Sequence, residues 1–122
     1  MQLNFESEKP LFLQLAEIIE DAILSGAFPE ETQIPSTTEI SVGYKINPAT
    51  ALKGINLLVD EGVIYKKRGV GMFVNKGAVL KLQEKHKSDF LESYVNSLIQ
   101  EARKLNIKKE DIITMIERGF DK

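Results

Sequence analysis

Two short stretches of the chain carry side chains of the kinds that bind nucleic acid. The first begins at Asn47 and continues through Thr50 to Lys53, which together offer an amide, a hydroxyl and an ammonium group. The second covers residues 66–68 and reads Lys-Lys-Arg. Amides and hydroxyls hydrogen-bond to base edges, whereas lysine and arginine neutralise phosphates. To bind one duplex together, the two stretches must lie on the same surface.

The first stretch opens a predicted helix over residues 48–61. Asn47 is a favourable N-cap, and Pro48 suits the first helical position because its missing donor is not needed there. Gly62 is expected to end the helix. The buried stripe at helical spacing is Ala51, Ile55, Leu58 and Val59. The polar start is the end that a recognition helix presents to DNA, although an ordinary capped core helix has the same features.

A shorter helix is predicted just before it, over residues 37–42. Ser36 and Glu39 have the spacing of a capping box. Gly43 is expected to end this helix, so that residues 44–47 form a tight turn. Two helices joined in this way are typical of the helix-turn-helix motif. Upstream, residues 28–35 are expected to form a loop because they contain two prolines.

The first helix is predicted between Pro10 and Gly26, with one broad apolar face that forms core. Residues 2–5 are expected to form a short strand or a docked arm. After Gly62, alternation predicts strands at residues 63–66 and 72–74, joined by a basic, glycine-rich turn. Helix, turn, helix and basic hairpin occur in the order of a winged helix. A solvated hairpin whose charges serve solubility is the alternative.

The C-terminal part is predicted to be a long helix over residues 78–105 and a last helix from residue 110. Residues 81–89 are mostly polar and are expected to bridge two domains, at 1–76 and 77–122. The apolar residues form a seam that two helices cannot bury alone, so a homodimer is favoured over packing back on the same chain. The expected dimer interface is Phe90, Leu91, Tyr94, Val95, Leu98, Ile99, Ala102, Ile112 and Ile116.

Composition and charge narrow the function classes. The chain has 122 residues, no cysteine and a net charge of −2. Residues 1–43 hold one basic and eight acidic residues, whereas residues 44–76 hold six basic and two acidic ones. A local basic surface matters more for DNA than the total charge, because screening acts over ~8 Å. The sequence has no signal-peptide pattern and no apolar run near the ~20 residues of a membrane span, so a cytoplasmic protein is expected.

With these pieces in order, the sequence from Pro10 to Val74 resembles the GntR family of bacterial transcription regulators. The matching pieces are Pro10-Leu11-Phe12 with Gln14-Leu15, Ile23-Leu24-Ser25-Gly26, Ile34-Pro35-Ser36 with Glu39-Ile40, Asn47-Pro48 with Thr50, Asp60-Glu61-Gly62-Val63-Ile64, and Arg68-Gly69-Val70-Gly71-Met72-Phe73-Val74. The Asn-Pro cap and the short two-helix tail resemble the YtrA subfamily, which lacks the large effector domain of other branches.

The resemblance implies a mainly α fold with a small β-hairpin wing, in which a winged helix-turn-helix domain precedes a two-helix C-terminal dimerisation tail. It also implies a homodimer that binds a palindromic double-stranded DNA operator, usually to repress. The DNA-contacting positions that it implies are Ser36, Thr37, Thr38, Tyr44, Lys45, Asn47, Pro48, Ala49, Thr50, Lys53, Lys66, Lys67, Arg68 and Gly69.

Some positions depart from the family pattern. Thr38 stands where an arginine is usual, Ala49 and Leu52 stand where polar or basic residues are usual, and residues 30–31 read Glu-Glu where glycine before an acid is common. Fewer guanidinium groups mean fewer bidentate guanine contacts. We therefore expect weaker binding or an A·T-rich operator, with Ala49 near a thymine methyl.

Other functions fit the sequence less well. The one histidine, His86, lies in a polar helical stretch, as a surface residue would, rather than beside a nucleophile. Residues 69–71, Gly-Val-Gly, are too short for a phosphate-binding loop. No cofactor or metal is expected, and no motif marks a site for a small-molecule effector, which stays open. A winged helix that binds protein instead of DNA is the second candidate, because the first 43 residues are acidic.

Overall fold

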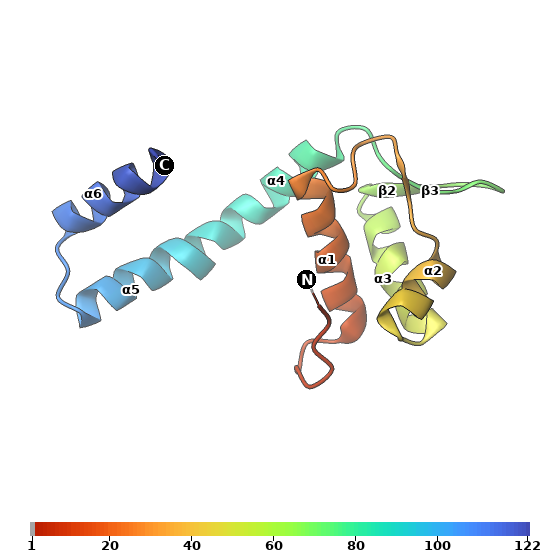
Figure 1. Cartoon of the computed structure of the whole chain (residues 1–122), viewed down its shortest axis with the longest axis horizontal. Coiled ribbons are helices and arrows are strands. Elements are labelled where there is room, and N and C mark those ends of the chain that lie inside the picture. Colours follow the sequence, from red (N-terminus) through yellow and green to blue (C-terminus); the bar gives the residue numbers. More distant parts are fainter. Residues whose placement is uncertain (1) are drawn as a thin grey trace. The chain divides into compact units, whose positions relative to one another are not determined.

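The computed structural model describes residues 2–122, which divide into a first compact unit that ends at Glu84 and a second, Lys85–Lys122. As predicted, the fold is mainly helical with a small sheet (Figure 1). The elements that lie wholly in the first unit are α1 (Leu11–Ser25), β1 (Gln33–Ile34), α2 (Thr37–Tyr44), α3 (Pro48–Asp60), β2 (Ile64–Lys67) and β3 (Gly71–Val74).

The core of the first unit forms where α1 packs against α3. The apolar face predicted for α1 is buried, with Leu15 and Ile23 fully inaccessible to solvent. The α3 stripe is buried as predicted at Ala51, Ile55 and Leu58, whereas Val59, its fourth predicted member, is only partly buried. Gly26, with φ 87°, ends α1 in the left-handed region where glycine carries no side-chain penalty.

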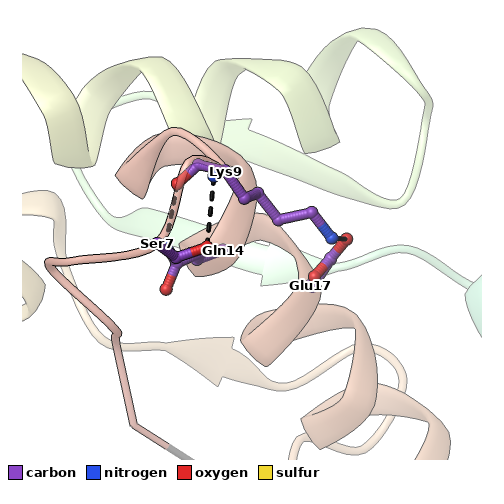
Figure 2. A network of polar contacts seen from close by, with 4 residues as sticks. All are labelled: Ser7, Lys9, Gln14 and Glu17. Atoms are coloured by element: carbon purple, nitrogen blue, oxygen red, sulfur yellow. Dashed lines mark hydrogen bonds and ion pairs between the residues drawn. The ribbon is translucent and has the colours of Figure 1, made fainter.

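The arm before α1 is docked on the helix and forms no strand. The Gln14 side chain accepts the Asn4 N–H at 2.7 Å and donates to the carbonyls of Asn4 and Lys9 at 2.9 and 2.8 Å. Figure 2 shows Lys9 held by Ser7 and Gln14, with its Nζ paired to Glu17. The side chain of Gln14 thus makes hydrogen bonds to the backbone near both ends of the arm, at Asn4 and at Lys9.

The helix-turn-helix has the predicted caps but a different turn. The capping box is present, because Ser36 Oγ accepts the Glu39 N–H and the Glu39 carboxylate accepts the Ser36 N–H. The prediction that Gly43 ends α2 is wrong: α2 continues to Tyr44, and Lys45 ends it at φ 56°. The turn closes here because the buried Ser41 donates its hydroxyl to the Ile46 carbonyl at 2.7 Å and accepts the Ile46 N–H at 3.0 Å through its own carbonyl.

The wing belongs to a three-stranded antiparallel sheet of order β1-β3-β2. The two-residue β1 lies in the segment predicted to be a loop, so that prediction is corrected. Its register pairs Gln33 with Phe73 and Ile34 with Met72. Ile34 is buried, and this contact with the core explains why the segment is held as an edge strand despite its prolines.

The chain leaves the sheet into α4 (Ala78–Phe90), whose start belongs to the first unit. The expectation that residues 81–89 only bridge two domains misses Leu82, which is fully buried in the first core together with Ala78. These two residues are four apart and so lie on one helical face. The first unit therefore continues to Glu84.

The second unit contains the end of α4, a π-helical segment η1 (Leu91–Val95), α5 (Asn96–Lys104) and α6 (Lys109–Phe120). The long helix predicted over residues 78–105 is thus present but includes the π segment. The last helix begins with Glu110 and Asp111 in its first turn, as predicted. Among residues 2–122, no helix combines the length and apolar character needed to cross a bilayer.

The left-handed backbone at Glu31, φ 64°, gives a testable prediction about the loop before β1. The Glu31 N–H donates to the Val74 carbonyl at 2.8 Å, which fixes this conformation. Left-handed geometry costs a residue with a side chain ~1–2 kcal/mol, and glycine avoids this cost. Glycine also loses more conformational entropy on folding than other residues, which offsets part of the stabilisation. We expect Glu31→Gly to raise the free energy of unfolding by ~0.5–1 kcal/mol, measured by urea denaturation.

Glu31→Ala is the matched control, because it removes the same side chain without freeing the backbone. An equal gain in both variants would contradict the backbone explanation.

Candidate nucleic-acid interface

A shallow hollow of about 300 Å³ lies where the start of α2, the middle of α3 and the wing meet. It brings together residues that are far apart in the sequence, such as Gln33 and Val70, which are 37 residues apart. Its lining carries one cation and, among the described residues, no carboxylate. The polar and charged residues that line it are Gln33, Ser36, Thr37, Thr38, Asn56 and Lys66.

The start of α3 presents the edge predicted to read bases. Asn47 is exposed and caps the helix by accepting the Ala49 N–H at 2.8 Å. Pro48 and Ala49 are exposed beside it, whereas Thr50 is half-buried. The Asn47 amide therefore combines a capping bond with a solvent-facing position.

Lys53 lies on the side of α3 that faces α1. Its Nζ is 4.2 Å from the centre of the Phe12 ring, a cation–π contact that holds the ammonium beside the helix. Both residues line a second hollow of about 430 Å³, together with Ala49, Leu52 and Asn56. The exposed edge of α3 is thus flanked by a hollow on each side.

The two wing lysines lie on opposite faces of the sheet. Side chains alternate along a strand, so Lys66 shares the face of the buried Ile64, and it lines the hollow beside α3. Lys67 shares the outer face with Tyr65 and places its Nζ 5.7 Å from the Phe73 ring centre. Tyr65 and Phe73 stack at 5.7 Å on this outer face.

The base of the wing turn is tied to β1. Gln33 Nε2 donates to the Val70 carbonyl at 3.0 Å. Gly71 has φ 145°, and a side-chain carbon there would collide with the Gln33 amide. Any other residue at position 71 would therefore have a strained backbone and would displace the Gln33 amide. Arg68 and Gly69 are exposed in the turn beyond it.

Two further residues from the predicted site lie at the helix-turn-helix turn. Tyr44 is half-buried and packs against the core, and Lys45 is exposed at the end of α2. Sequence reasoning did not place Gln33, Asn56 or Val70 in the site. Asn56 follows Leu52 by four residues, so the helical period was a usable signal, whereas Gln33 depends on the unrecognised β1.

The second unit carries the residues predicted for the dimer interface on its surface. Phe90, Leu91, Tyr94, Leu98, Ile99 and Ile116 are exposed, Val95 and Ile112 are half-buried, and Ala102 is buried. An apolar hollow of about 370 Å³ lies between α5 and α6 and is lined by Leu98, Ile99, Ala102, Ile107 and Ile112, with Arg103 and Lys109 at its edges. Among the described residues, no group of acidic residues and histidine is placed to hold a metal ion.

A capped α2, an exposed polar edge on α3 and an adjoining hairpin define a winged helix-turn-helix domain. The chain belongs to the gntR family of bacterial regulatory proteins, whose sequence model matches residues 11–74. It is accordingly a DNA-binding transcriptional regulator of the YtrA-like type and not an enzyme.

Curated relatives from Bacillus subtilis (strain 168) fall into two lengths. The uncharacterized HTH-type transcriptional regulator YurK is 32% identical over 75% of this chain, but the chain spans only 38% of it. The uncharacterized regulator YhcF is 26% identical over 96% of this chain and 95% of its own length. The HTH-type transcriptional repressor YtrA is 25% identical over 92% of this chain and 85% of its own.

Solved structures agree with this family. A GntR-family transcriptional regulator from Bacteroides thetaiotaomicron is 34% identical, with a TM-score of 0.69 over 90% of this chain and 96% of that one. The DNA-binding domain of AraR, solved in complex with operator ORR3, is 30% identical with a TM-score of 0.51 and covers 61% of this chain and 92% of that one.

The opposite faces of the two wing lysines give a prediction. Lys66→Ala should lower the dependence of log affinity on log salt by about one phosphate contact for any duplex sequence. Lys67→Ala, its matched control, should have a smaller effect because its ammonium lies over Phe73. The measurement is a fluorescence-anisotropy titration of a duplex over a range of salt. A larger effect at Lys67 would mean that the outer face of the wing meets the DNA.

Proposed function

We propose that this chain acts as a homodimer that binds a near-palindromic DNA operator and represses transcription from it in the cytoplasm. The observation that carries the proposal is the hollow shared by the start of α2, by α3 and by the wing. The hollow brings the ammonium group of Lys66, which can bind a phosphate, close to the amide of Asn56 on α3. The repressor YtrA and the operator complex of AraR support the direction of regulation and the ligand.

The residues that line the hollow, and the exposed starts of α3 and of the wing turn, have separate roles in this proposal. The start of α2, with Thr37 and Thr38, faces a phosphate, because the first N–H groups of a helix attract anions. Asn47 and Thr50 meet base edges in the major groove. Lys66 and Arg68 approach the backbone or the minor groove beside them.

The apolar centre of the reading edge favours particular bases. Leu52 is 48% exposed and Val70 54% exposed, and Leu52 lines both hollows. No guanidinium lies near them on α3 to fork onto a guanine. Apolar side chains in the major groove contact the thymine methyl group. We therefore propose an operator whose half-sites are rich in A·T pairs at the positions that face Ala49 and Leu52.

The exposed apolar residues of the second unit support the proposed dimer. Its exposed aromatic and aliphatic residues lie on α4, η1, α5 and α6, and contiguous apolar surface of this kind marks a protein–protein contact. A two-fold pair buries the same surface of both copies and gives the symmetry that a palindrome requires.

Selection of binding sites from a random duplex pool tests the DNA ligand. We expect selected sites to contain paired, inverted half-sites with A·T pairs in each. Affinity for them should fall steeply with salt, by about 10³-fold or more between 50 and 200 mM if six or more phosphates are neutralised. Sites with only G·C pairs in the half-sites would contradict the proposed contacts. Failure to retain any duplex at low salt would favour the protein-binding alternative.

Charge placed in the tail tests the dimer. Tyr94→Asp with Leu98→Asp should give monomers, because two carboxylates would be buried without partners in the interface. Sedimentation velocity measures the change in mass. Val42→Asp is the matched control, since Val42 is an exposed aliphatic residue of the first unit. An unchanged mass for the double variant would contradict the proposed interface.

A further inference from the structure

The start of α4 is capped by a carboxylate from far upstream. The two oxygens of Glu30 accept the backbone N–H groups of Gly77 at 2.8 Å and of Val79 at 3.0 Å. The first N–H groups of a helix have no partner within the helix, so this carboxylate satisfies two of them at once. The bonds to Gly77 and Val79 hold the pKa of Glu30 below its usual range, and Glu30 is therefore charged at neutral pH.

The same turns of α4 are also bonded to the end of the proposed recognition helix. Lys81 Nζ donates to the Glu61 carbonyl at 3.2 Å, just after α3. Asn75 Nδ2, before α4, donates to the Gly62 carbonyl at 2.9 Å. We call the bonds made by Glu30 and Lys81 the junction clamp. It joins the loop before β1, the end of α3 and the start of α4.

Packing below the clamp removes the remaining freedom of these turns. Ala78 and Leu82 are buried in the core beside it, with 1% and 0% of their surfaces exposed. The polar bonds hold the backbone at Gly77 and Val79 and the side chain of Lys81, and the apolar contacts hold Ala78 and Leu82. The clamp therefore holds the first turns of α4 to the first unit.

We infer that the junction clamp sets the spacing between half-sites that the protein accepts, with Glu30 and Lys81 acting as positioning residues. The inference rests on the proposed dimer and its palindromic operator. In such a dimer, α4 is the connection between each reading domain and the tail. Half-sites are read at separations near one helical turn, about 10 base pairs, and one inserted pair both shifts and rotates a half-site. A domain held by a stiff connection cannot follow that change.

The test compares Glu30→Gln with Glu31→Gln, a matched control that removes the same charge one residue away. Glutamine at position 30 keeps one acceptor oxygen and turns an NH₂ group toward the second backbone N–H. Both full-length variants are titrated against duplexes that carry the selected half-sites at the preferred spacing and at one pair more or less. A duplex with a single half-site is titrated in parallel, and melting temperature reports folding.

For the wild type and Glu31→Gln we expect about a tenfold loss of affinity per inserted or removed pair, a typical coupling between linked sites. For Glu30→Gln we expect that loss to fall to about threefold or less, with single half-site affinity unchanged within about twofold. Lys81→Met, which changes only an exposed side chain, should broaden the spacing preference in the same direction. It keeps the test available if Glu30→Gln does not fold.

Three results would overturn the inference. The first is a spacing profile unchanged in both clamp variants. The second is an equal loss on the single half-site and on the paired site, which would make the clamp a general support of the fold. The third is a wild type that prefers no paired half-sites, and this result alone would also remove the proposed dimeric function.

Discussion

The close approach of α1 and α3 at Gly54 is the constraint on which the reading surface depends. A side-chain carbon at Gly54 would lie 2.9 Å from the Phe12 carbonyl oxygen and 3.2 Å from Leu15 Cδ2. The two helices therefore meet almost backbone to backbone, and α3 cannot rotate about its axis. With this face fixed in the core, the opposite edge, which carries Ala49, Leu52 and Asn56, faces solvent. Core packing decides which side chains can meet a duplex.

Sequence predicts the parts of the fold that are determined locally. The apolar period of α1, the cap at Asn47 and the capping box at Ser36 each act within one or two turns of chain. The parts that were missed depend on specific contacts that the local sequence pattern does not show. The two-residue β1 exists because Ile34 reaches the core and pairs with Met72. The end of α2 at Lys45 depends on the Ser41–Ile46 bonds, which outweigh the local preference for glycine.

In the candidate site, too, sequence predicts some features and not others. Residue types alone indicate the start of α3 and the basic wing tip as surfaces suited to DNA. They do not tell Lys66 from Lys67, because the face that each occupies follows from the strand register with β3. Nor do they find Gln33, whose bond to the Val70 carbonyl aims the wing turn. Which groups converge is therefore a property of the sheet, although the groups themselves are visible in the sequence.

The two units differ in how much of their apolar surface they bury by themselves. The first has a closed core that includes the first turns of α4. Within residues 85–122, Ala102 is the one buried side chain. In the proposed dimer, the second unit gains stability from association, because the two copies cover each other's apolar surface. Tail pairing in that dimer also raises the effective concentration of the second reading domain at its half-site. Operator affinity therefore depends on tail packing as well as on the contacts to the bases.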